Sequence, residues 1–375
     1  MDLAVILTVV SVIVAIVALI IAFLTFRVQY PDHAKRALRI SAIGLVAALI
    51  LATIVLFVAS PTRTEEFLLK PDVGVRTSDI GLSDLITGPD DNLWFTESQA
   101  DSIGAINTAG ALTEFSVRNG AGGSSGPSGI VVGPDRNLWV AESNGSRVEA
   151  FNGSGVKIHQ VLIQSTSSAP RFITVGPDGN IWFTDAGTHS IGRIKLQESQ
   201  SQAEEFSLDS DSTPSALTSG PDERLWFTDS TKNSIGRLDP RDPVNSLKMF
   251  PLPSAKSFPF GIARGADKNL WFTESGGARI GRITPSGVIT EFMLPGALSS
   301  PQVIIAGPGD AMWFTDSANN RIGRIDRNGN VRDFSIPSPV SSPTGIAVGP
   351  DGAIWFTEAN SNKIGHLIPY VPGRL

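Results

Sequence analysis

Seven acidic residues recur at one position of a repeated motif, directly after a Trp-Phe-Thr run or a close variant of it. They are Glu97, Glu142, Asp185, Asp229, Glu274, Asp316 and Glu358. A ring of carboxylates near a channel would attract a cation, but seven uncompensated carboxylates would repel one another. We therefore expect these acids to be mostly structural. Each would bind the backbone of the following loop or a basic residue there, such as Arg147, Arg279, Arg321 or Lys363.

A second set of positions varies between the copies of the motif. Each copy contains Pro-x-Gly-Ile or a variant of it, and we call the seven positions x the slot residues. They are Ser83, Ser128, Arg171, Ser215, Phe260, Gln302 and Thr344. A group that is needed only once must differ from copy to copy, so function should be sought at these positions. We expect the slot residues to bind a ligand at one mouth of a central channel.

The spacing of the tryptophans predicts the architecture that positions these residues. The seven tryptophans, at 94, 139, 182, 226, 271, 313 and 355, are separated by 42 to 45 residues. A fixed period in this range is typical of solenoids and propellers. Each copy holds four short apolar runs separated by turn signals such as Gly-Pro-Asp. The sequence therefore predicts an all-β, seven-bladed β-propeller over residues 61–375.

Two features of the motif read as packing. Trp and the following Phe occupy adjacent strand positions and so point to opposite faces of the blade. The Gly of Ile-Gly-Arg-Ile leaves room for a bulky side chain on the adjoining strand. The seventh copy lacks the last run of the motif, whereas residues 64–70 supply one before the first copy. We expect this N-terminal strand to complete the seventh blade and so to cover its open edge.

Residues 1–60 contain two uncharged apolar runs, at about 3–26 and 40–60. Each is long enough to cross a bilayer as a helix. The segment between them carries all four basic residues of this region, which places it in the cytoplasm by the positive-inside rule. The sequence thus predicts a two-helix transmembrane anchor in the cell membrane and an extracytoplasmic propeller. Residues 58–60 loosely resemble a signal cleavage site, which leaves open whether the anchor is retained.

Composition excludes several function classes. The net charge is −6, and Lys and Arg form no cluster in the propeller region, so nucleic acid is not an expected partner. The chain contains no cysteine, which excludes disulfides, thiolate metal sites and a cysteine nucleophile.

The full motif, PxGIxxGPDGxxWFTExxxNxIGRIxxxGxITEFxLP, resembles that of the virginiamycin B lyase (streptogramin lyase) family of seven-bladed propellers, over roughly residues 64–370. The resemblance implies a carbon–oxygen lyase that opens a cyclic depsipeptide by elimination, with Mg²⁺ as helper. A general base would remove a proton next to a carbonyl, and the metal would stabilise the enolate.

The resemblance also implies which positions would be catalytic: a Tyr in the first slot, His in the last two slots and a Glu after the last Trp. At the corresponding positions this chain has Ser83, Gln302 and Thr344, and only Glu358 matches the family. Glu358 is thus the one candidate for a catalytic or metal-binding residue. Histidines elsewhere do not replace the missing base, and we expect His33, His159, His189 and His366 to be exposed and non-catalytic.

Two classes of function follow. The favoured one is a binding module, in which Arg171, Gln302, Thr344 and the slot serines hydrogen-bond a small molecule, a peptide or a glycan. The alternative is an enzyme, either a divergent lyase or a metal-dependent hydrolase that uses channel carboxylates such as Glu358.

Overall fold

The computed structural model describes residues 62–69, 80–118, 124–197, 202–296 and 298–369. Residues 64–375 form one compact unit. Both apolar runs of residues 1–60 lie outside the described residues, and no helix within the described ranges is long and apolar enough to cross a membrane. The transmembrane anchor therefore stays a prediction from the sequence.

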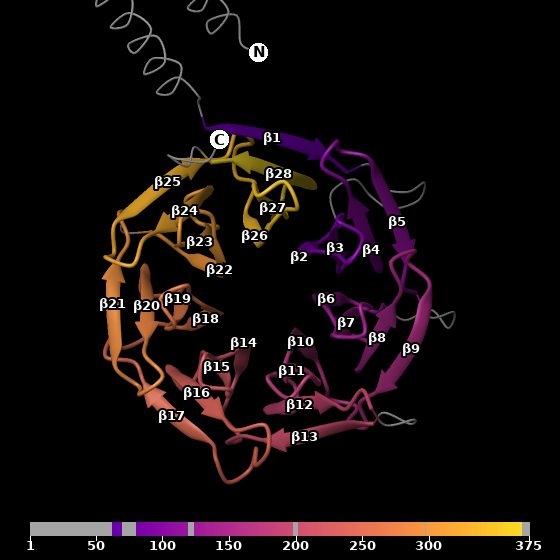
Figure 1. Ribbon diagram of the computed structural model, residues 1–375, viewed down its shortest axis with the longest axis vertical. Coiled ribbons are helices and arrows are strands. Elements are labelled where there is room, and N and C mark those ends of the chain that lie inside the picture. Colours follow the sequence, from indigo (N-terminus) through magenta and orange to yellow (C-terminus); the bar gives the residue numbers. More distant parts are fainter. Residues whose placement is uncertain (1–61, 70–79, 119–123, 198–201, 297, 370–375) are drawn as a thin grey trace, which may run out of the picture. The chain divides into compact units, whose positions relative to one another are not determined.

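The described chain forms seven four-stranded antiparallel sheets arranged in a ring, which confirms the predicted seven-bladed propeller (Figure 1). From the axis outward, blades one to three consist of β2 (Leu82–Thr87), β3 (Leu93–Glu97), β4 (Ser102–Ile106) and β5 (Leu112–Ser116); β6 (Pro127–Val132), β7 (Leu138–Glu142), β8 (Arg147–Phe151) and β9 (Lys157–Leu162); and β10 (Pro170–Val175), β11 (Ile181–Asp185), β12 (Ser190–Ile194) and β13 (Ala203–Ser207). Blades four and five consist of β14 (Pro214–Ser219), β15 (Leu225–Asp229), β16 (Ser234–Leu238) and β17 (Lys248–Pro251); and β18 (Pro259–Arg264), β19 (Leu270–Glu274), β20 (Arg279–Ile283) and β21 (Ile289–Met293). Blades six and seven consist of β22 (Pro301–Gly307), β23 (Ala311–Asp316), β24 (Arg321–Ile325) and β25 (Val331–Ser335); and β26 (Pro343–Val348), β27 (Ile354–Glu358), β28 (Lys363–Ile368) and β1 (Arg63–Leu68).

Trp and Phe of the motif pack on opposite faces of the blade in six of the seven blades, as their adjacency predicts. In blade one, the Trp94 ring stacks on Phe115 of the outer strand, with centroids 5.4 Å apart. The Phe95 ring lies instead over Gly104, where an added Cβ would come within 2.1 Å of the ring. The Gly is therefore required by close approach, and the aromatic residues serve the core.

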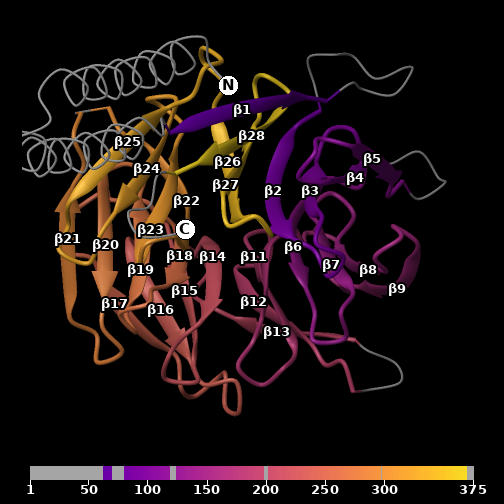
Figure 2. The same ribbon diagram turned by 45° about the horizontal axis from the view of Figure 1, so that its top comes forward.

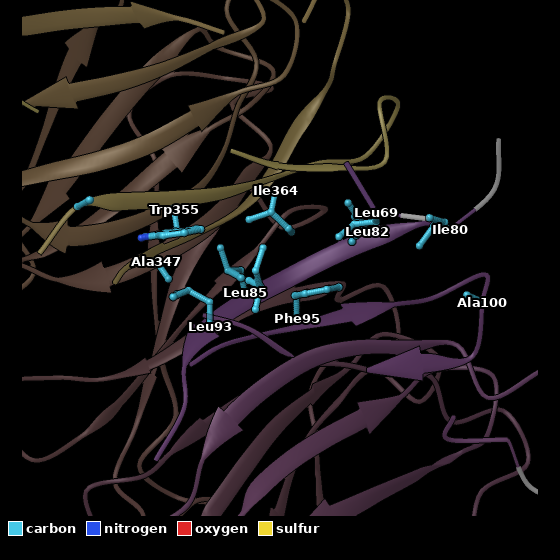
Figure 3. Packing of buried hydrophobic residues seen from close by; sticks show 12 residues of the cluster. Leu69, Ile80, Leu82, Leu85, Leu93, Phe95, Ala100, Ala347, Trp355 and Ile364 are labelled. Atoms are coloured by element: carbon cyan, nitrogen blue, oxygen red, sulfur yellow. The ribbon is translucent and has the colours of Figure 1, made fainter. Parts of the chain in front are cut away.

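β1 is the outermost strand of blade seven and lies along β28 (Figures 1 and 2). Phe67 stacks on Trp355 at 5.6 Å, which repeats the packing of the other outer strands. Glu66 accepts a 2.6 Å bond from Lys363 and two further bonds from Ser338. Leu69 follows β1 and enters the apolar cluster between blades seven and one (Figure 3). The first strand of the described residues thus pairs with the last, and this pairing completes blade seven.

We predict that a chain starting at Asp72 is less stable than one starting at Pro61, because removal of β1 exposes Trp355 and leaves the edge of β28 unpaired. The lost packing and ion pair amount to about 5 kcal/mol, which would lower the melting temperature by roughly 5 to 10 °C. Calorimetry on both chains measures this, and Phe67→Ala in the longer chain should give a smaller decrease. Equal melting temperatures for the two chains would show that β1 contributes nothing to closure.

Candidate functional site

The innermost strands of all seven blades begin around the channel axis (Figure 1). In each blade the register shifts between the first residue of that strand and the Ile or Leu three positions later. This irregularity contains the slot residue. Six of the seven slot residues line one cavity of about 100 Å³ at the channel mouth, together with four neighbours. The lining residues are Ser83, Asp84, Ser128, Gly129, Arg171, Phe172, Phe260, Gln302, Val303 and Thr344.

The threonines of the Trp-Phe-Thr runs hold the slot backbone in place. In blade one, the Thr96 hydroxyl accepts a bond from the Asp84 N–H (3.0 Å) and donates to the Ser128 carbonyl of blade two (2.7 Å). The same pair of contacts occurs in blades three to seven through Thr184, Thr228, Thr273, Thr315 and Thr357. Each hydroxyl therefore joins two strands of its own blade to the next blade.

Blade two has Ala141 in place of this threonine, and its slot residue compensates. The Ser128 hydroxyl lies 3.0 Å from the Arg171 carbonyl of blade three and 3.2 Å from the Ala141 carbonyl. Thr344 is likewise bonded to Thr357, at 2.7 Å, and to the Ser83 carbonyl, at 3.2 Å. These two slot hydroxyls are engaged in joining blades. These hydroxyls therefore serve the structure of the mouth, because their bonds to the protein are already made.

Other slot residues differ in what they offer to a ligand. Ser215 is buried and does not line the cavity, so the structure does not bring it to the predicted site. The Gln302 amide nitrogen donates to the Ser300 carbonyl (3.2 Å) and hydroxyl (2.9 Å), which orients the side chain. Phe260 from blade five meets Phe172 from blade three edge to face, with centroids 5.4 Å apart. The two rings form an apolar wall of the cavity.

Arg171 is the one cation that lines the cavity. Its guanidinium carbon lies 5.8 Å from the centroid of Phe172 and 5.2 Å from that of Phe260, within cation–π range. The side chain reaches water in the mouth, yet the surrounding protein still desolvates the guanidinium and lowers the pKa of Arg171. Within the described ranges no carboxylate forms an ion pair with it. Arg171 is therefore placed to receive an anionic group.

Asp84 also lines the cavity, and the sequence analysis missed it. Its Oδ1 accepts the Leu85 N–H at 2.9 Å, and its Oδ2 accepts the Ile130 N–H of blade two at 3.1 Å. Burial raises the pKa of Asp84 to about 6, and the two backbone bonds oppose this shift. The repeat offered a signal for this residue. Blades two, five and seven have glycine at the equivalent position, so an aspartate in blade one departs from the pattern.

The acids that follow Trp-Phe-Thr do not line the cavity. All seven are at most 2% exposed. Asp185 accepts N–H bonds from Ala169, Gly187 and Thr188, and Asp316 pairs with Arg321 at 2.9 Å. The structure thus supports the structural interpretation of this set. It also corrects the idea that these acids are carboxylates of the channel.

Glu358 shares this buried position, so the one matching family residue lies away from the cavity. Burial together with Glu66 raises the pKa of Glu358 to about 7, and a side-chain hydrogen bond from Ser341 opposes this shift. Glu66 is itself engaged by Lys363. A carboxylate beside an ammonium group does not make a Mg²⁺ site.

The donor groups at the mouth do not fit Mg²⁺ either. The cavity has one carboxylate, Asp84, whose oxygens already accept two N–H bonds, and it also holds the cation Arg171. Across the described part of the chain, no three His, Asp or Glu side chains are grouped so that they would hold a metal ion. The residues therefore do not match the metal that the family resemblance implies.

The histidines lie where the sequence places them but are less exposed than expected. His366 is 5% exposed and stacks on Trp355 at 4.1 Å, between Glu65 (3.3 Å) and Asp351 (2.8 Å). Blades three, four and five place an arginine over the tryptophan at this position. His159 and His189 are half-buried, and none of these three histidines lines the cavity. The expectation of exposed side chains is wrong, because each imidazole packs on or bonds to its own or a neighbouring blade. His33 lies outside the described residues.

Comparison with known proteins identifies relatives of this propeller. The family model of the "Virginiamycin B lyase family" matches residues 70–200 and 156–370. A streptogramin B lyase structure is 31% identical, with a TM-score of 0.73, and the alignment covers 82% of this chain and 97% of that one. Virginiamycin B lyase from Staphylococcus aureus is 32% identical, with a TM-score of 0.73 and coverage of 82% and 100%. A catalytically inactive variant of that enzyme, solved with quinupristin, is 32% identical, with a TM-score of 0.74 and the same coverage. No curated protein sequence matches the chain.

Proposed function

Because this chain belongs to the virginiamycin B lyase family but has Gln302 and Thr344 where the resemblance implies histidines, we propose that its propeller is a ligand-binding module. The ligand would be a small molecule, a peptide or a glycan bound at the channel mouth. One observation carries the proposal: six of the seven slot residues line one cavity, which holds an arginine without an ion partner among the described residues and neither histidine nor tyrosine.

Efficient elimination would need a proton acceptor that the slot residues do not provide. An amide and a hydroxyl cannot take a proton near neutral pH, whereas an unperturbed histidine can. Loss of a positioned general base typically removes a factor of about 10² to 10⁴ in rate. The hydroxyl of Thr344 is in addition bonded to Thr357 and to the backbone of blade one. Thr344 therefore acts as scaffold here.

A second candidate, a divergent carbon–oxygen lyase, is favoured by Asp84. This carboxylate lines the cavity, and its pKa of about 6 would let it accept a proton near neutral pH. A metal-dependent hydrolase has less support, because the acids after Trp-Phe-Thr are buried away from the cavity. A measurement of streptogramin turnover distinguishes the lyase proposal from the binding-module proposal.

We also propose that residues 1–60 anchor the protein in the cell membrane and that the propeller is extracytoplasmic. The two apolar runs and the basic residues between them support this topology. A reporter fused at Lys35 should then report the cytoplasm, and one fused after Leu375 should report the outside. The opposite pattern of reporter signals would contradict the proposed topology.

We predict that the purified protein does not linearise virginiamycin B with Mg²⁺ at a rate comparable to lyases of this family. Elimination conserves mass, so chromatography must separate the linear product before mass spectrometry. The double variant Gln302→His with Thr344→His should recover little activity, because Ser83 and the buried Glu358 leave the remaining family positions incomplete.

The binding function has a complementary readout in the same protein. A library of peptides, glycans and metabolites is screened for compounds that raise the melting temperature of the protein. These compounds should not raise the melting temperature of the Arg171→Gln variant. Arg264→Gln, at the far end of an inner strand, is the matched control. Rapid conversion of virginiamycin B by the unmodified protein would contradict the proposal, and so would stabilisation by library members that is unaffected by Arg171→Gln.

A further inference from the structure

We propose that the channel mouth recognises a zwitterionic ligand, a free amino acid, whose carboxylate pairs with Arg171 and whose ammonium group pairs with Asp84. This inference rests on the proposed binding function and specifies the ligand for that cavity. It arises from two opposite charges that share one small cavity without pairing with each other.

Arg171 and Asp84 are the two charged residues among the ten that line the cavity. No ion pair joins them, although opposite charges in a confined site usually meet. Each is held by its own scaffold. The rings of Phe172 and Phe260 flank the guanidinium, and the N–H groups of Leu85 and Ile130 fix the carboxylate. The two charges are thus preorganised and separate.

Such an arrangement carries a free-energy cost that a bridging ligand would offset. Taking a charge partly out of water is unfavourable unless a counter-charge compensates it. The lowered pKa of Arg171 and the raised pKa of Asp84 both reflect this desolvation. A ligand with one anionic and one cationic end would neutralise both groups at once. Little conformational entropy would be lost, because both side chains are already held.

The other residues that line the cavity indicate that the rest of the ligand is apolar. Phe172, Phe260 and Val303 supply apolar surface beside the two charges. A cavity of about 100 Å³ holds the charged head of an amino acid, and the remainder would extend into the open mouth. A simple anion such as sulfate would pair with Arg171 but would be repelled by Asp84. The geometry therefore favours a zwitterion over a bare anion.

Three matched probes test the inference by calorimetric titration of the full chain at pH 7.2. L-phenylalanine carries both charges, N-acetyl-L-phenylalanine carries the carboxylate alone, and 2-phenylethylamine carries the ammonium alone. Phenylalanine should bind at least tenfold more tightly than either analogue. Arg171→Gln and Asp84→Asn should each weaken phenylalanine binding at least tenfold, whereas Arg264→Gln should leave it unchanged.

A second variant of Asp84 guards against loss of the fold. Asp84→Gly introduces the residue that blades two, five and seven have at this position, so the backbone there already accommodates it. Binding should be lost in this variant while the melting temperature stays within a few degrees of the unmodified protein. The pH dependence gives a further readout, because phenylalanine keeps both charges between pH 5 and 7.2. Its binding to the unmodified protein should weaken at pH 5, where Asp84 is mostly protonated, and equally tight binding at pH 5 and 7.2 would overturn the pairing with Asp84.

The outcomes separate this inference from the broader proposal. Equal binding of phenylalanine and its N-acetyl form, unaffected by either Asp84 variant but lost with Arg171→Gln, would overturn the zwitterion and leave a carboxylate-binding module. Binding that survives substitution of both residues would show that the probe binds elsewhere and would overturn the inference. Absence of binding by all three probes would also overturn it, while the library experiment would still decide the binding function.

Discussion

The hydrogen bond from a buried threonine to the slot carbonyl of the next blade is the contact on which the rest of this propeller depends. It occurs in six blades at 2.6 to 3.2 Å, and all six threonines are fully buried. Each such bond contributes about 1 kcal/mol net, but an unpaired buried hydroxyl or carbonyl would cost more. Because the accepting carbonyl belongs to a slot residue, the contact that closes the ring also fixes the floor of the cavity. Stability and the candidate site therefore share one set of atoms.

Blade two shows what happens when this contact is absent. Ala141 replaces the threonine, and the Ser128 side chain provides the bond to blade three instead. The same strand has Val140 where other blades have Phe, and its partner Glu149 replaces the usual Gly. The smaller side chain leaves room for a buried Glu149, which pairs with Arg147 at 3.2 Å. Departures from the motif thus occur in compensating pairs. One of them gives the slot residue Ser128 a structural contact between blades.

Much of this architecture followed from the sequence, because each blade repeats the same local contacts. The Trp period, the Phe over Gly packing and the convergence of the slots are properties of one motif copied seven times. Asp84 is visible in the repeat only as a departure from it, and its contact with the backbone of blade two could not be read from the sequence. Burial of His366 was missed for a related reason. Its surroundings are completed by β1, which lies about 300 residues away in the chain. The predicted anchor in residues 1–60 lies outside the described residues.

We propose that the mouth of this propeller binds a ligand through Arg171 and Asp84, and its donor groups do not fit the metal that the family resemblance implies. A crystal structure of the protein soaked with Mn²⁺ and L-phenylalanine, with anomalous data collected for manganese, tests it most directly. We expect ligand density with a carboxylate against Arg171 and no anomalous peak at Glu358 or in the cavity. An anomalous peak coordinated by Glu358 or Asp84, with no ligand at Arg171, would contradict it.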